Sequence, residues 1–144
     1  MLVSPQRDCV HWYGALASHS GQEVALSLPM MDSQATIHFL RHLLTVFPVQ
    51  PILLFLDRAP WHRGEAIRAF LAENPRLQLI YFPPACPQLN PQEHVWKAAR
   101  HAIGHNHSFL TLGTLRQACA RFLDHTFFHF QWVEKFAPLI LCHV

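Results

Sequence analysis

Charged residues are scarce in this sequence. Asp, Glu, Lys and Arg make up 14% of its 144 residues, whereas hydrophobic residues make up 51%. This composition argues against a disordered chain, because there are enough apolar side chains to form a core. The formal net charge is only +2, which is too small by itself to indicate an anionic partner. The length suits a single domain.

The sequence also lacks the features of membrane, secreted and several catalytic or phosphate-binding proteins. No apolar run is long enough to span a bilayer, and no signal peptide follows Met1. There is no glycine-rich phosphate loop, no G-x-S-x-G motif and no H-E-x-x-H motif. The four cysteines are Cys9, Cys86, Cys119 and Cys142, and they form no C-x-x-C pair. This spacing favours reduced thiols in the cytoplasm.

The first half of the hydrophobic pattern predicts a hairpin followed by a helix. Val10–Leu16 and Val24–Leu28 are typical of two strands, and the Gly and polar residues between them favour a β-hairpin over Val10–Leu28. Ser33 is expected to cap a helix that runs to Phe47, in which apolar residues recur every 3.6 residues or so.

The middle of the chain predicts a strand–helix–strand unit. Ile52–Asp57 is an apolar strand that ends in an acid, a helix follows Gly64, and Leu77–Phe82 is the next strand. A connection of this kind implies parallel strands with a right-handed crossover. Asn90 is expected to cap a helix over Pro91–Gly104, which carries Glu93 in its first turn.

The C-terminal part of the chain predicts helices. Leu115, Cys119, Phe122 and Thr126 mark a fourth helix, and the aromatic segment Phe127–Phe136 favours a short fifth one. The order of elements therefore indicates an α/β fold with a mixed sheet flanked by helices.

Asp57 and Glu93 are the candidate functional acids. Asp57 ends a parallel strand, where ligands collect in open α/β sheets. The alternative is that Asp57 only opens a turn by an Asx hydrogen bond. Glu93 has a structural alternative too, since it could form a capping box with the Asn90 amide. If the strand end and the helix start face each other, the two acids could share divalent metal ions that act on phosphodiesters.

Basic residues near these acids are candidates for DNA contacts. Lys97 and Arg100 lie one and two helical turns after Glu93, on the same face, where they could meet the phosphates of a duplex. For Lys97 the alternative is an ordinary Glu–Lys helix pair.

The twelve histidines suggest zinc only weakly. His101, His105 and His107 form one possible set, and His125 and His129 form another, but no Cys or acid completes either set. Contact with solvent or nucleic acid is the favoured interpretation.

Two motifs carry a resemblance to a known family. They are Asp57–His62, with the sequence DRAPWH, and Pro83–Lys97, with the sequence PPACPQLNPQEHVWK. Together they resemble the catalytic signature of bacterial insertion-sequence transposases of the mariner-like superfamily. That signature runs Asp-Asn-Ala-x-x-His and then Pro-Pro-Tyr-Ser-Pro-x-Leu-Asn-Pro-Ile-Glu-x-x-Trp. Arg58 and Ala85-Cys86 depart from it.

The resemblance implies a ribonuclease-H-like fold and a DDE triad of acids. Asp57 corresponds to the second Asp and Glu93 to the Glu, so both would be metal ligands. The three acids of the family hold two Mg²⁺ or Mn²⁺ ions, and the site is incomplete in these residues. The family cleaves DNA and transfers the strand to a target. The signature also contains a His at the position of His62. This residue would orient a metal ligand or a phosphate, or it would only pack beside Trp61. Asn90 would be a second residue that supports the metal ligands.

The family's first Asp has no counterpart in these residues. It lies on a central strand that precedes the hairpin, and neither Asp8 nor Asp32 can replace it. The resemblance therefore predicts a partial catalytic domain that lacks the first central strand and is inactive alone, with an upstream-frame half as a possible partner.

The partners and location follow from the same resemblance. Double-stranded DNA would contact Arg58, Arg63, Lys97 and Arg100, no membrane is involved, and a homodimer is possible. We expect a bacterial cytoplasmic, nucleoid-associated protein. The alternative function is a DNA-binding remnant or an inhibitor of a full-length transposase, without catalysis.

Overall fold

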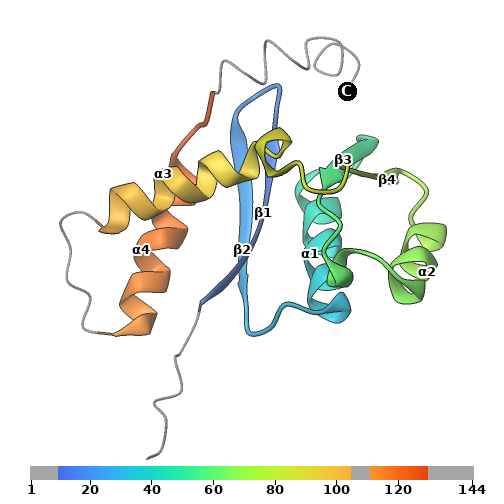
Figure 1. The fold of residues 1–144 in the computed structure, drawn as a ribbon, viewed down its shortest axis with the longest axis horizontal. Coiled ribbons are helices and arrows are strands. Elements are labelled where there is room, and N and C mark those ends of the chain that lie inside the picture. The colour runs from blue at the N-terminus through green and yellow to red at the C-terminus, as the bar shows by residue number, and fades with distance from the viewer. Residues whose placement is uncertain (1–9, 105–110, 130–144) are drawn as a thin grey trace, which may run out of the picture.

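A β-hairpin lies at the centre of the molecule. In the computed structural model, which describes residues 10–104 and 111–129, the hairpin consists of β1 (His11–Ala17) and β2 (Gln22–Leu28) (Figure 1). The strands are antiparallel, with Gly14 opposite Ala25. The turn depends on Gly21, whose φ of +75° favours glycine. The predicted hairpin is confirmed.

Helix α1 (Ser33–Val46) covers one face of the hairpin (Figure 1). Its N-cap is Asp32, whose Oδ1 accepts a hydrogen bond of 2.7 Å from the amide of Ala35. The predicted cap at Ser33 is therefore wrong by one residue, because Asp32 is the residue that keeps extended backbone angles. At the other end of the helix, Arg76 donates hydrogen bonds to the carbonyl oxygens of Leu44 and Phe47.

A strand–helix–strand unit packs beyond α1 (Figure 1). It consists of β3 (Ile52–Leu56), α2 (Glu65–Glu73) and β4 (Leu77–Tyr81). The two strands are parallel, as predicted. The short 3₁₀ helix η1 (Pro60–His62) follows β3 and brings His62 back towards the strand end.

The four described strands form two separate sheets rather than one continuous mixed sheet. In the described part of the chain β1 pairs only with β2, and β3 pairs only with β4. Among residues 10–104 and 111–129, β1 and β3 each have one edge without a ladder partner. Tyr13 bridges the two parts, because its ring meets the ring of His62 edge-on at 6.3 Å.

Helices α3 (Gln92–Gly104) and α4 (Leu112–His125) cover the other face of the hairpin (Figure 1). Thr111 caps α4. Phe127, at the start of the predicted fifth helix, instead forms an isolated β-bridge with Gln22. The rest of that prediction, residues 130–136, lies outside the described residues.

The alternation of side chains along the hairpin explains why it has a core on each face. Tyr13 and Val24 belong to a cluster with α1 and α2, whereas Trp12 and Ala25 pack against the cluster of α3 and α4. Within residues 10–104 and 111–129, no helix is both long and apolar enough to cross a membrane.

Candidate active site

Asp57 directly follows β3, with a side chain that is 57% exposed. Its Oδ1 accepts a hydrogen bond of 3.0 Å from the amide of Ala59, so the Asx turn considered above is formed. The same oxygen lies 2.7 Å from Nδ1 of His62. The turn therefore engages Oδ1 and leaves Oδ2 available to a ligand, so the structural and functional interpretations of Asp57 are compatible.

The imidazole of His62 is held from several sides. A carboxylate can only accept hydrogen bonds, so Nδ1 carries the proton that it shares with Asp57. The hydroxyl of Tyr81 donates a hydrogen bond of 2.6 Å to the His62 carbonyl oxygen, and the Trp61 and His62 rings meet edge-on at 6.0 Å. Both interpretations of His62, orienting Asp57 and packing beside Trp61, are compatible with this geometry.

Glu93 lies in the first turn of α3 and is exposed. The Asn90 amide donates to the carbonyl oxygen of Pro87 at 3.1 Å, so it is not available for the capping box with Glu93. Instead the Asn90 side chain accepts a hydrogen bond of 3.1 Å from the Gln92 amide. Asn90 thus serves the start of the helix, and the Glu93 carboxylate remains free of that role.

Asp57 and Glu93 line the same open cavity, of about 220 Å³. Arg58 also borders it, with its Nε 3.0 Å from the carbonyl oxygen of Phe82, to which it donates a hydrogen bond. The remaining wall is the proline-rich loop between β4 and α3, and its lining residues are Pro83, Pro84, Ala85, Cys86, Pro87 and Asn90. The end of β3 and the start of α3 therefore border the same cavity, together with the loop.

The donor set of the cavity suits a hard divalent cation, because both acids offer carboxylate oxygens. The number of possible ligands is small, however, since the described residues contain no group of three or more His, Cys, Asp or Glu side chains that could hold a metal ion. Asp32 caps α1 and does not border the cavity, and Asp8 lies outside the described residues. The cavity therefore offers two carboxylates to a cation, from Asp57 and Glu93.

Comparison with known proteins identifies the family. Residues 2–116 match the family described as "DDE superfamily endonuclease". The chain belongs to this family. Over 125 residues it is 26% identical to "Insertion element IS630 uncharacterized 39 kDa protein" of Shigella sonnei, a match that covers 85% of this chain and 36% of that protein. It is also 32% identical over 89 residues to "Uncharacterized protein y4pE/y4sA" of Sinorhizobium fredii, covering 61% and 63% respectively.

A solved structure supports the fold of this DDE endonuclease chain. The Mos1 transposase, in the paired-end complex with the left transposon end, aligns with a TM-score of 0.62 over 88% of this chain and 43% of that one, at 16% identity. The family match thus assigns the chain to the DDE endonucleases, and the likeness to the Mos1 transposase supports the expected ribonuclease-H-like fold. The chain spans less than two thirds of the length of each of these relatives.

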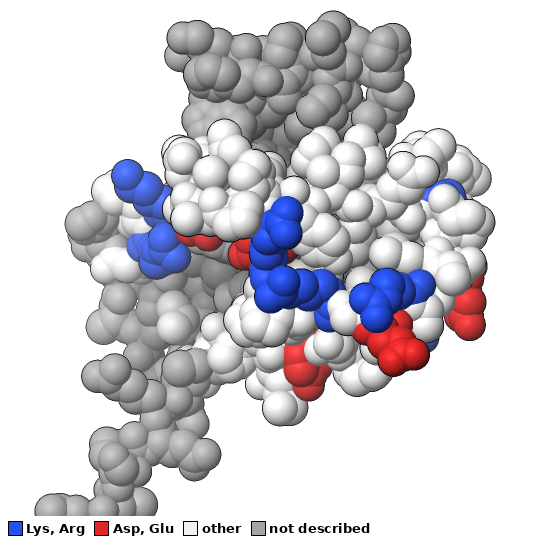
Figure 2. All heavy atoms as spheres, turned by 45° about the vertical axis from the view of Figure 1, so that its right-hand side comes forward, with Lys and Arg blue, Asp and Glu red and all other residues white. Residues whose placement is uncertain are grey.

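The basic residues predicted to contact DNA are all exposed, and they are Arg58, Arg63, Lys97 and Arg100. Figure 2 shows that Lys and Arg side chains gather across one face of the molecule, with acidic side chains beside them. The structure does not support the predicted zinc sites. In one set, His125 Nδ1 lies 2.9 Å from the Arg121 carbonyl oxygen and is engaged there. In the other set, His105 and His107 lie outside the described residues.

The structure adds a pair of residues that sequence reasoning missed. Glu23 on β2 and Gln92 at the start of α3 are both buried, and the Gln92 amide donates a hydrogen bond of 2.5 Å to Glu23 Oε1. Burial raises the pKa of Glu23 to about 8, and the hydrogen bond from Gln92 lowers it only in part. Their separation by 69 residues explains why no local pattern indicated the pair.

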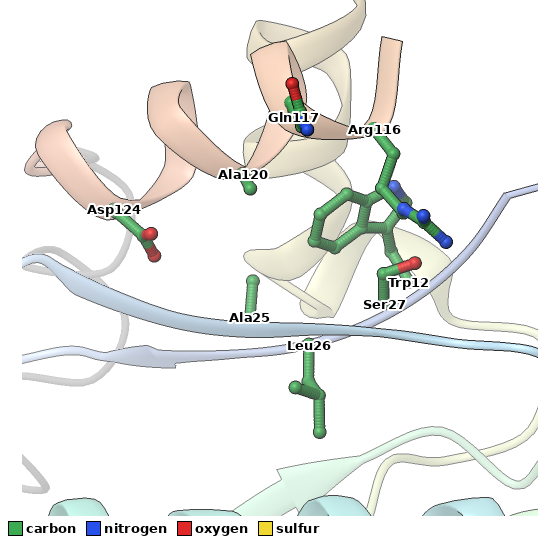
Figure 3. A pocket seen from close by; sticks show the side chains of 8 residues that line it. All are labelled: Trp12, Ala25, Leu26, Ser27, Arg116, Gln117, Ala120 and Asp124. Carbon is green, nitrogen blue, oxygen red and sulfur yellow. The ribbon is translucent and has the colours of Figure 1, made fainter. Parts of the chain in front are cut away.

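A second, larger cavity of about 330 Å³ lies away from the two acids, between the hairpin and α4. Trp12, Ala25 and Ser27 line it from the hairpin, and Arg116 and Asp124 from α4 (Figure 3). Neither Asp57 nor Glu93 reaches this cavity.

Proposed function

We propose that this chain is the part of an insertion-sequence transposase that carries two of its three catalytic acids. Its reaction would be metal-dependent cleavage of a DNA phosphodiester, followed by transfer of the strand to a target. The observation that carries this proposal is the shared cavity of Asp57, at the end of β3, and Glu93, in the first turn of α3.

In this proposal Asp57 Oδ2 and the Glu93 carboxylate hold Mg²⁺ or Mn²⁺. A divalent ion bound there would supply Lewis-acid chemistry that activates water or a DNA 3′-hydroxyl and stabilises the departing oxygen. The protein's own contribution is orientation. The Ala59 amide and the His62 ring fix Asp57 Oδ1, which leaves Oδ2 available to the ion.

The third acid would come from a segment outside these 144 residues. Within the described residues β1 and β3 each have an edge without a partner strand, which supports this, because a strand added there would complete the ladders of both sheets. Such a segment could belong to an upstream-frame half of the transposase. Without it the 144-residue chain is expected to be inactive, since two acids hold a second ion poorly.

Double-stranded DNA is the proposed partner. The exposed side chains of Arg58, Arg63, Lys97 and Arg100 support this, because Lys and Arg neutralise phosphates and set the register of a duplex. The Mos1 transposase, whose fold this chain shares, was solved with a transposon end. A protein with this partner would act at the bacterial nucleoid, and a homodimer would allow it to engage two ends.

Plasmid nicking tests the proposal. Supercoiled DNA would be incubated with Mn²⁺ and either the 144-residue chain alone or the chain extended by the polypeptide encoded directly upstream of Met1. We expect nicking only by the extended protein, and we expect Glu93→Gln to abolish it while leaving duplex binding intact. Equal nicking by the wild type and by Glu93→Gln would overturn the catalytic assignment.

The same experiment distinguishes the alternative of a DNA-binding remnant or inhibitor. The specific observation in its favour is that the described residues contain two acids at the cavity and no third. Salt-sensitive duplex binding without nicking by any extended protein would establish that alternative instead.

A further inference from the structure

Two buried polar side chains connect the hairpin to the helix that carries Glu93. Glu23 is 5% exposed and Gln92 is 9% exposed. Gln92 Nε2 donates to Glu23 Oε1 at 2.5 Å. Among the described residues, the buried side-chain atoms left without a hydrogen-bond partner are Glu23 Oε2 and Gln92 Oε1, one from each member of this pair.

A proton on Glu23 would satisfy both of these atoms. An ionised carboxylate can only accept hydrogen bonds, and Gln92 Oε1 can only accept them as well. A neutral carboxyl group has one O–H donor, so Oε2–H could donate to Gln92 Oε1 while Oε1 accepts from Nε2. Both groups are planar, so the two hydrogen bonds would close a ring and leave no buried atom unpaired.

We propose that Glu23 is a positioning residue whose neutral carboxyl group forms a two-hydrogen-bond pair with the Gln92 carboxamide and so fixes the first turn of α3, with Glu93, on the hairpin. The role of Glu93 in this statement rests on the proposed function, whereas the neutral pair itself does not.

The surroundings of the pair support a positioning role. Gln92 is the first residue of α3 and directly precedes Glu93, so any movement of Gln92 carries the acid with it. Trp96, one turn later, packs against Gly14 so closely that a Cβ at Gly14 would lie 2.6 Å from its ring. That same Cβ would lie too close to Glu23 Oε1 as well. The first turn of α3 is thus seated on β1 and β2 by direct contact.

Burial accounts for the protonation. It raises the pKa of Glu23 to about 8, well above the value of 4.5 for an exposed glutamic acid. No ionisable side chain contributes to this shift. Those on the elements packed against the hairpin include His94 and Lys97 on α3, Asp124, which lines a cavity with Ala25, and His129, whose ring lies beside Gly21.

The direction of the pH effect follows from these values. Between pH 4.5 and about 8 the folded chain keeps a proton on Glu23 that the unfolded chain has lost. The contribution of the neutral pair to stability is therefore fully present below pH 4.5. It is lost progressively as the pH rises towards 8, and it changes no further above that value.

Glu23→Gln tests the pair directly, because a glutamine amide mimics the neutral carboxyl group at every pH. Urea unfolding of the full chain would be measured from pH 5 to 9.5 for the wild type and this variant. We expect the unfolding equilibrium constant of the wild type to rise relative to that of the variant by about tenfold per pH unit up to about pH 7.5. The ratio should level off above about pH 8.

Glu65→Gln, the same change at an exposed site on α2, is the matched control and should give no such slope. Because all three proteins share every other ionisable side chain, their comparison isolates the effect of the substituted glutamate. If the wild type and Glu23→Gln have parallel pH profiles, Glu23 is ionised in the folded protein and the proposal is wrong.

The positioning role has its own readout in Mn²⁺ affinity. Above pH 8 the wild type should bind Mn²⁺ less tightly than Glu23→Gln, whereas the two should agree at pH 6.5. Equal affinities at both pH values would refute the positioning role. Absence of Mn²⁺ binding in both proteins would count against the proposed function, and the pH slope of unfolding would still decide whether the neutral pair exists.

Discussion

Nδ1 of His62 lies 2.7 Å from Oδ1 of Asp57, and this hydrogen bond joins a half-buried ring to an exposed acid. The side chain of His62 is 18% exposed, whereas that of Asp57 is 57% exposed. The ring is therefore the fixed partner, and it determines the direction in which the carboxylate points. The Tyr81 hydroxyl extends this support by holding the His62 backbone.

Replacement of His62 by Phe should weaken the metal site without unfolding the protein. The phenyl ring keeps the contacts with Tyr13 and Trp61 but cannot donate to Asp57. We expect Mn²⁺ affinity to fall by about 10- to 100-fold, as for other partners that orient metal ligands. Isothermal titration calorimetry would measure this. His38→Phe, at an exposed position on α1, is the control, and an equal loss in both variants would refute the role of His62.

Gly14→Ala should destabilise the protein through a local clash. The new Cβ would lie 2.3 Å from Glu23 Oε1 and 2.5 Å from Gln92 Nε2, so α3 would have to move away from the hairpin. We expect a loss of about 1–3 kcal/mol in the free energy of unfolding, measured in urea. Gly113→Ala, in the first turn of α4, meets only Thr111 Oγ1 at 3.7 Å and should be neutral or stabilising. A neutral Gly14→Ala variant would contradict the close seating of α3.

The position of the α1 cap can be tested with two neighbouring variants. Asp32→Ala removes the side chain that accepts from the Ala35 amide and should cost about 0.5–2 kcal/mol of stability. Ser33→Ala, inside the first turn, should change the unfolding midpoint little. The opposite ranking in thermal or urea unfolding would restore Ser33 as the cap.

DNA binding should depend on salt through Lys97 and Arg100. If each neutralises one phosphate, alanine at either position should reduce the slope of log affinity against log salt by about 0.9. Fluorescence anisotropy with a labelled duplex at several salt concentrations would measure it. Arg121→Ala, on α4 and away from the cavity of the two acids, should leave the slope unchanged. Identical slopes for all variants would place the duplex elsewhere.

The strand–helix–strand unit could be predicted closely from the sequence because its signals are local. Ile52–Leu56 is an unbroken apolar run, and Gly64 and Asn74 bracket α2. The position of the α1 cap could not be predicted as well, because Asp32 and Ser33 are adjacent and both are good capping residues. Only the backbone angles distinguish them, and these depend on how the hairpin leads into the helix.

The candidate site shows the same division between local and long-range information. Asp57 and Glu93 could be identified because each lies beside a recognisable strand end or helix start. Glu23 could not, since its burial depends on which face of β2 meets α3, and its partner Gln92 is distant in the sequence. The split into two sheets likewise depends on strand pairing over long separations.

Manganese binding to the 144-residue chain tests the central claim most directly, because it requires neither DNA nor a third acid. Electron paramagnetic resonance would measure free Mn²⁺ in the presence of the wild type, Asp57→Asn and Glu93→Gln. Each substitution removes a charge while keeping the shape of the side chain. We predict one weak site in the wild type and its loss in both variants. Equal binding by all three proteins would contradict a metal site shared by Asp57 and Glu93.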